Sequence, residues 1–309
     1  LIFDMHNEYG TAAQAEGGAG TVKGLRDLFG PRVMIYTLDQ KATLARGVQP
    51  DGVVTIQASE IGIDDIALLA RELNLNETAV ESSYILQGKL GDRWLTELTS
   101  WESGDLPERA EQFGLHLGAL QALWRKLTRL RGKPYIRWSE RPSTAPSDGS
   151  WESVGEGRAS ANGRSVVADM VDHIAKGRHI ILEFGHQEDL LSYLLVANVL
   201  TRAIRSSYVD ATERFRATQR PEDKPRQLMI TIEEAHSFLS PEVARSTTFG
   251  QIAREMRKYS VTLLVVDQRP SEIETEVLSQ IGSRLICLLD DDKDVDAVLS
   301  GLSGANRLK

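Results

Sequence analysis

Short apolar runs along the chain predict seven buried β-strands, at residues 1–4, 32–38, 52–57, 179–184, 228–233, 261–267 and 284–289. Most are continuous stretches of Val, Ile and Leu rather than alternating apolar and polar positions. Such runs are typical of strands that are covered on both faces in a parallel sheet. Helical patterns over 189–215 and 247–260 separate the later runs. The repeated order of strand, helix and strand predicts right-handed crossovers and an α/β fold.

The middle of the chain has a different pattern. From Glu60 to about Leu130, apolar residues recur at spacings of three and four, which predicts helices without an intervening strand. The stretch that follows is rich in Ser, Pro and Gly and predicts a long exposed loop. We therefore expect a first part of an α/β core, a helical insert, an exposed loop or linker, and a second part of the core, at residues 1–59, 60–138, 139–163 and 164–309.

The composition narrows the class of protein. Of the 309 residues, 41% are hydrophobic and 26% are charged, which are ordinary values for a globular protein. The single cysteine, Cys287, excludes an internal disulfide framework and favours a reducing compartment such as the cytoplasm. No apolar run approaches the roughly 20 residues that span a bilayer, so we expect no membrane partner. The net charge of -8 argues against a surface that coats nucleic acid as a whole, but it is compatible with a basic channel within an oligomer.

Two adjacent carboxylates, Glu233 and Glu234, stand at the end of the predicted strand 228–233. Ligands of open α/β sheets bind at the carboxyl ends of the strands, so charge at this position indicates a site. A strand that ends in two acids is the Walker B arrangement of nucleotide-hydrolysing motors, in which the first acid orients Mg²⁺ and the second polarises the attacking water. The alternative is a solvated turn that begins a helix, where acids interact favourably with the N-terminal dipole.

A second apolar strand, at 261–267, ends on Gln268. An amide at such a strand tip can hydrogen-bond both a terminal phosphate and the attacking water. The alternative is an ordinary exit into a turn that contains Pro270 and Ser271. That alternative weakens because two successive β-α units end in polar tips.

The helix predicted before this strand carries three cations, Arg254, Arg257 and Lys258. An arginine that projects from one subunit into the site of the next can neutralise charge in the transition state, a contribution of about 10³–10⁵ in rate. For any one of these side chains alone, a solvated basic face is the simpler interpretation.

At the start of the chain, Asp4, His6 and Glu8 alternate with other residues, so on an extended chain their side chains point the same way. This spacing suits a metal site. The alternative is a polar strand exit followed by a turn at Gly10.

Together, the segments "LIFDMHNEYG", "LMITIEEAHSFL" and "IAREMRKYSVTLLVVDQRPS" resemble the HerA family of hexameric DNA-translocating ATPases, relatives of FtsK and of conjugative pump ATPases. The resemblance covers the beginning and roughly the last 130 residues of the chain. It implies a RecA-like P-loop NTPase fold with a mostly parallel sheet flanked by helices. It also implies ATP and Mg²⁺ as cofactors, a hexameric ring that translocates double-stranded DNA, and a nuclease partner such as NurA or an antiviral defence effector.

The resemblance assigns roles to the acids and the amide. Glu234 corresponds to the catalytic glutamate, and Glu233 to the acid on the Mg²⁺ side, which holds the ion through water. The family often has Asp at this second position, so the carboxylate of Glu233 extends one methylene further. Gln268 corresponds to the sensor glutamine.

The resemblance also assigns roles to cations and to the first strand. Arg257 corresponds to the arginine that acts in trans on the neighbouring subunit, with Arg254 as the second choice. Asp4 and Glu8 match an acidic element that borders the nucleotide site.

One part of the family pattern has no counterpart in these residues. No G-x-x-x-x-G-K-[ST] phosphate loop occurs in the sequence, and the nearest glycine-rich stretch, 16–24, lacks the required spacing. In the family this loop precedes the "D-x-H-x-E-Y" strand. We therefore expect the chain to be an internal segment of a longer protein, and to be inactive and at most a weak oligomer by itself.

Two other functions remain open. The carboxylates of Asp4, Glu8, Glu233 and Glu234 could converge as a two-metal nuclease, although Gln268 and the arginine helix would then be unused. A non-catalytic, ATPase-like scaffold for a partner effector would keep the fold without turnover. The basic stretch 125–137 is more simply a solvated helix end than a DNA contact.

Overall fold

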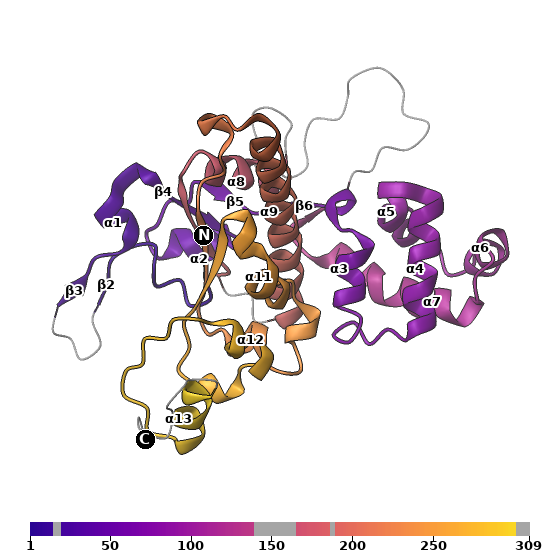
Figure 1. Ribbon diagram of the computed structural model, residues 1–309. Coiled ribbons are helices and arrows are strands. Elements are labelled where there is room, and N and C mark those ends of the chain that lie inside the picture. The colour runs from indigo at the N-terminus through magenta and orange to yellow at the C-terminus, as the bar shows by residue number, and fades with distance from the viewer. Residues whose placement is uncertain (15–19, 139–164, 186–188, 301–309) are drawn as a thin grey trace. The chain divides into compact units, whose positions relative to one another are not determined.

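The computed structural model describes residues 1–14, 20–138, 165–185 and 189–300. Its main feature is a six-stranded sheet in the order β10-β9-β1-β8-β4-β5. The strands at one end of this order, β4 and β5, are labelled in Figure 1. In that order the strands are Val261–Val265, Leu228–Ile232, Ile2–Asp4, His179–Glu183, Val33–Thr37 and Gly52–Val53. The pairs from β10 to β4 all run parallel. The predicted α/β fold, with a parallel sheet of the P-loop NTPase type, is confirmed.

The apolar runs form strands because their residues are covered on both faces. Phe3 in β1, Ile35 in β4, Leu182 in β8 and Ile230 in β9 are completely buried. The outermost strand, β10, differs because only Val261 in it is buried. The predicted coverage on both faces therefore holds for the four strands from β9 to β4 and weakens at the edge of the sheet.

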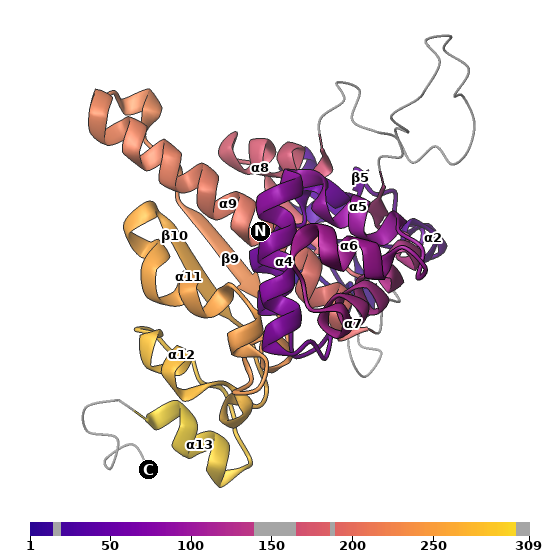
Figure 2. The same cartoon turned by 90° about the vertical axis from the view of Figure 1, so that its right-hand side faces the viewer.

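Helices accompany the sheet in a first compact unit, residues 1–51 and 170–309. They are α1 Leu25–Phe29, α2 Gln40–Ala45, α9 Leu190–Thr218, α10 His236–Leu239, α11 Phe249–Glu255, α12 Thr275–Gln280 and α13 Asp292–Leu299. The boundary at residue 170 falls within α8 Val166–Ala175. A short hairpin, β2 Ala13–Gln14 with β3 Thr21–Val22, lies near the start of the chain. The long α9 and the shorter α11 correspond to the helices predicted over 189–215 and 247–260, and α11 lies beside β10 in both views (Figures 1 and 2).

An aromatic cluster joins the strands of the first unit to its helices. The ring of Phe3 lies 5.4 Å from Phe249 of α11, 6.2 Å from Phe184 and 6.4 Å from Phe238 of α10, centroid to centroid. Phe238 and Phe249 are themselves in edge contact at 5.4 Å. Aromatic pairs of this kind add about 0.5–1.5 kcal/mol each beyond the area they bury. The cluster therefore anchors α10, which begins directly after the two acids.

Two strand predictions were wrong. The run 52–57 divides into β5 and a separate strand, β6 Ile56–Gln57, which pairs with β7 Ile136–Arg137 outside the main sheet. The run 284–289 is irregular, and its Leu285 and Leu288 side chains are 97% and 87% exposed. A strand forms only beside a hydrogen-bonding neighbour, and none of the described strands pairs with this segment.

A second compact unit, residues 52–169, contains the helices of the predicted insert. They are α3 Ile63–Leu68, α4 Glu77–Leu90, α5 Trp94–Ser100, α6 Leu106–Phe113 and α7 Leu117–Leu127. Leu86, Trp94 and Leu120 are completely buried, so this unit has an apolar core of its own. The loop predicted at 139–163 lies outside the described residues.

Candidate functional site at the carboxyl edge of the sheet

The strands β9 and β10 bring the predicted acid and amide to the same edge of the sheet. Their register pairs Ile232 with Val265, so the residues that follow both strands emerge side by side. The side-chain amide of Gln268 donates to Oε1 of Glu234 at 3.5 Å. These two residues, 34 positions apart in the sequence, therefore share one site.

The backbone at Glu234 has an uncommon conformation that its surroundings maintain. Its φ of 46° lies in the left-handed region, which non-glycine residues adopt at an energetic cost and most often at functional sites. The turn is held to the end of β10, because the amide of Ala235 donates to the carbonyl of Val266 at 3.3 Å. On the other side, α10 is anchored by Phe238 in the aromatic cluster. The Glu234 side chain remains 23% exposed, so solvent reaches its carboxylate.

Asp4 and Glu233 form a buried pair of acids beside this turn. The carboxylate of Asp4 accepts hydrogen bonds from the backbone amides of Glu8 and Tyr9, both at 3.0 Å, so it organises the turn after β1. Burial raises the pKa of Glu233 to about 7, and the negative charge of Asp4 adds to this effect. Burial also raises the pKa of Asp4.

One oxygen of Glu233 suits a cation. Its Oε2 atom is buried and has no hydrogen-bond partner. An unpaired buried carboxylate oxygen is costly, and a divalent ion with its bound water would satisfy it. The described residues contain no group of three or more His, Cys, Asp or Glu side chains that could hold a metal ion by themselves.

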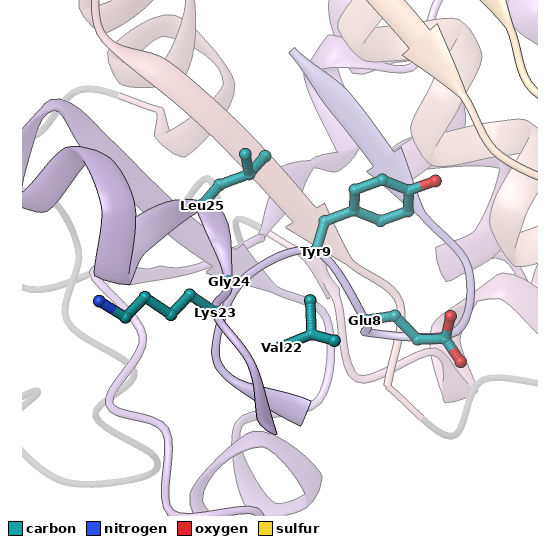
Figure 3. A pocket seen from close by; sticks show the side chains of 6 residues that line it. All are labelled: Glu8, Tyr9, Val22, Lys23, Gly24 and Leu25. Carbon is teal, nitrogen blue, oxygen red and sulfur yellow. The ribbon is translucent and has the colours of Figure 1, made fainter. Parts of the chain in front are cut away.

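Glu8 lines a small pocket. The pocket has a volume of about 260 Å³ and is lined by Glu8, Tyr9, Val22, Lys23, Gly24 and Leu25 (Figure 3). Tyr9 connects it to the acids, because burial, and then the charges of Glu233 and Asp4, raise the pKa of the phenol. The role of Asp4 and Glu8 at the border of a nucleotide site stays a prediction.

The two candidate arginines differ in their surroundings. Arg254, in α11, forms an ion pair with Glu276 of α12 at 3.3 Å. Arg257 lies one turn later, in the 3-10 segment Met256–Tyr259, and is exposed. Among the hydrogen bonds and ion pairs between described residues, none joins either arginine to Glu234 or Gln268. An action in trans, by Arg257 or by Arg254, stays a prediction.

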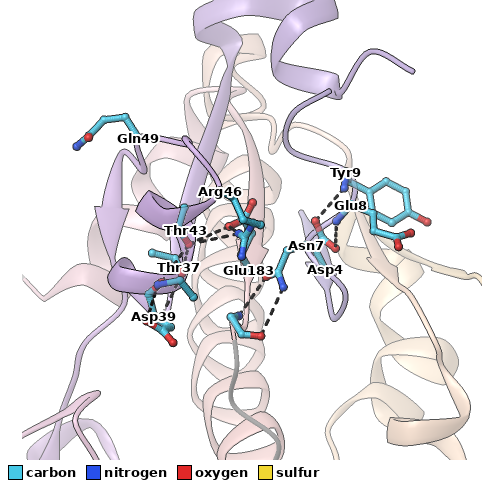
Figure 4. A network of polar contacts seen from close by, with 12 residues as sticks. Asp4, Asn7, Glu8, Tyr9, Thr37, Asp39, Thr43, Arg46, Gln49 and Glu183 are labelled. Atoms are coloured by element: carbon cyan, nitrogen blue, oxygen red, sulfur yellow. Dashed lines mark hydrogen bonds and ion pairs between the residues drawn. The ribbon is translucent and has the colours of Figure 1, made fainter. Parts of the chain in front are cut away.

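A third strand tip carries an acid that the sequence patterns did not single out. Glu183 ends β8, directly beside Asp4 of β1, and is 1% exposed. It forms an ion pair with Arg46 and accepts a hydrogen bond from the Thr43 hydroxyl at 3.1 Å (Figure 4). The sequence could have indicated Glu183 by the same pattern as Glu233, because it is an acid at the end of an apolar run, "HIILE".

The sequence patterns did not indicate Asp267 either, because it is the last residue of the apolar run 261–267. Its side chain is buried against His236, just after the two acids. The carboxyl edge of the sheet therefore gathers acids from four neighbouring strands, β8, β1, β9 and β10, and one amide.

The chain is similar to a protein family and to several individual proteins. Residues 1–204 match the protein family described as "Helicase HerA, central domain". The DNA double-strand break repair helicase HerA of Sulfurisphaera tokodaii is 29% identical over 133 residues, or 42% of this chain and 26% of that protein. The protein of the same name from Pyrococcus furiosus is 39% identical over 74 residues, or 23% of this chain and 13% of that protein. The chain thus matches at most 26% of the length of these relatives.

None of the helices in the described parts of the chain is both long enough and apolar enough to cross a membrane.

Proposed function

Because this chain belongs to the family of the HerA helicase central domain, we propose that it is part of the ATP-hydrolysing core of a motor that translocates double-stranded DNA. The observation that supports hydrolysis is the contact between Glu234 and Gln268 at two neighbouring strand tips. An acid and an amide in direct contact can both hydrogen-bond the same neighbouring water molecule. DNA would be held by Lys and Arg side chains through its phosphates, and therefore with little dependence on sequence.

In this proposal each residue of the site has a separate task. Glu234 orients the attacking water and accepts its proton at the carboxylate. Gln268 holds the same water through its amide and contacts the terminal phosphate. Glu233 would hold Mg²⁺ through water, and its Oε2 atom is free to accept from that water. When bound, Mg²⁺ neutralises negative charge on the phosphate oxygens.

The proposal extends to a ring of subunits. Arg257 is exposed and would reach the nucleotide of a neighbouring subunit, where a guanidinium stabilises negative charge in the transition state. Arg254, which Glu276 holds, is the second choice. A hexamer would place each nucleotide between two copies. Because the relatives carry the name of double-strand break repair helicases, we propose that the motor works with a nuclease such as NurA, or another effector, on DNA ends.

The test is an ATPase assay on the full-length protein with and without duplex DNA. We expect Glu234→Gln to lower turnover by about 10²–10⁴-fold, the range of positioned acid-base catalysis, and to keep nucleotide binding within a few-fold of wild type. Glu222→Gln is a matched control, because it makes the same change on an exposed acid in the turn Pro221–Asp223.

Unchanged hydrolysis by Glu234→Gln would remove this residue from the mechanism. Absence of hydrolysis in the wild-type full-length protein would instead favour the non-catalytic scaffold.

A further inference from the structure

Asp267 is held by several hydrogen bonds at the edge of the sheet. It lies between Val266, which follows β10, and Gln268, and its side chain is only 3% exposed. Its Oδ2 atom accepts a hydrogen bond from the backbone amide of His236 at 2.7 Å, and its Oδ1 atom accepts one from the backbone amide of Arg269 at 2.6 Å. A carboxylate is buried at low cost only when such donors surround it. Asp267 is therefore not simply a solvent-exposed polar residue at the end of a strand.

The imidazole of His236 extends this contact to the catalytic acid. Its Nδ1 atom lies 3.0 Å from Oδ2 of Asp267 and 3.6 Å from Oε2 of Glu234. A nitrogen that faces two carboxylates favours the tautomer with its proton on Nδ1, which then donates to Asp267. The ring is thereby fixed beside Glu234, and the Glu234 side chain is flanked by His236 and Gln268.

These contacts join the two turns that carry the candidate catalytic residues. One turn contains Glu234 in its left-handed conformation, and the other contains Gln268. A strained backbone conformation persists only where the surrounding structure holds it. Asp267 holds the first turn through His236 and the second through Arg269, so one carboxylate determines the spacing of both.

We propose that Asp267 is a positioning residue for ATP hydrolysis, which acts by locking the Glu234 turn to the Gln268 turn through His236. The inference rests on the proposed function, since it names the residue that maintains the same site. Asp267 does not touch the water or the phosphate itself. Its removal lets the two turns move apart and disorganises the water held by Glu234 and Gln268.

The experiment compares Asp267→Asn and Asp267→Ala in the full-length protein. The asparagine keeps one acceptor oxygen, whereas the alanine removes both. We expect the alanine variant to lower kcat by about 10–100-fold, as loss of a supporting shell residue typically does, with the KM for ATP within about threefold of wild type. The asparagine variant should lie in between. Glu222→Gln is the control, because Glu222 is an exposed acid in the turn Pro221–Asp223.

A double-mutant comparison separates positioning from general damage. In the Glu234→Gln background, Asp267→Ala should lower kcat by less than threefold, because the carboxylate that the lock holds against Gln268 is already absent. A full additional loss, or a KM that rises in step with the fall in kcat, would overturn the proposal.

Hydrogen exchange provides a readout that is independent of turnover. In Asp267→Ala the backbone amide of His236 should exchange at least tenfold faster, while the strand amides of β9 stay protected. Unchanged exchange at His236 would also overturn the proposal. If the wild-type protein does not hydrolyse ATP but the amide responds, the proposed function fails and the lock between the turns stands.

Discussion

The buried carboxyl group of Glu183 lies between a cation and a hydroxyl, at the end of β8. Burial raises its pKa, and the attraction of Arg46 and the hydrogen bond from Thr43 oppose that rise only in part. A carboxyl whose pKa is higher in the folded state binds more protons folded than unfolded. The stability it contributes is therefore complete below its ordinary pKa and is lost as the pH rises through the folded value.

Because the contribution of Glu183 to stability falls as the pH rises, the effect of Glu183→Gln on stability should depend on pH. The amide keeps an acceptor for Thr43 and removes the buried charge. We expect the free energy of unfolding of the variant, relative to wild type, to be higher at pH 8 than at pH 5. Urea unfolding at the two pH values measures the difference. Glu222→Gln, on an exposed acid, should show no such change, and an equal difference for Glu183→Gln at both pH values would contradict the prediction.

The residues of the site were predictable to different degrees. Glu234 and Gln268 each follow an apolar strand, and parallel neighbours carry their tips to one edge, so the chemistry of the contact was visible in the sequence. The contact between His236 and Asp267 was not, because it depends on how two turns 31 residues apart pack together. The left-handed φ of Glu234 has no signal in the residue type.

At the scale of the elements, the apolar run 284–289 shows where a strand pattern fails. Its composition favours a strand, yet Leu285 and Leu288 are almost fully exposed. β10 is the last strand in the order of the sheet, and none of the described strands pairs with 284–289. A local pattern specifies the tendency to extend, whereas a partner strand supplies the hydrogen bonds. The central strands β1, β8 and β9 have partners on both sides and were predicted correctly.

The helices of the second unit allow a matched pair of glycine substitutions. Gly114 ends α6 with a left-handed φ of 68°, whereas Gly88 lies inside α4 and a side chain there would meet nothing within 4 Å. We expect Gly114→Ala to destabilise the protein by about 1–2 kcal/mol, because of the backbone conformation. Gly88→Ala should stabilise it by about 0.5–1 kcal/mol, because alanine loses less backbone freedom in a helix. Urea unfolding measures the change in the free energy of unfolding for both variants. Changes of the same sign in the two variants would refute the assignment of Gly114 as the end of the helix.

For the molecule as a whole, the missing phosphate loop makes a prediction about the 309-residue chain by itself. The backbone amides of such a loop and its lysine provide most contacts to the phosphates. We expect calorimetry to detect no tight ATP binding to this chain, and an ATPase assay to detect no turnover. Full-length protein serves as the positive control. Tight binding by the chain alone would show that its own residues can replace the loop.

The amino-acid sequence by itself determined the class of fold and the edge at which chemistry occurs. Continuous apolar runs produce strands buried on both faces, and polar residues can follow them only where the strands leave the core. The tertiary structure decided which of these polar residues touch one another. The ion pair between Arg46 and Glu183 spans 137 positions, and the contact of Asp267 with His236 spans 31. Such contacts depend on the packing of whole elements, which no local pattern of residues specifies.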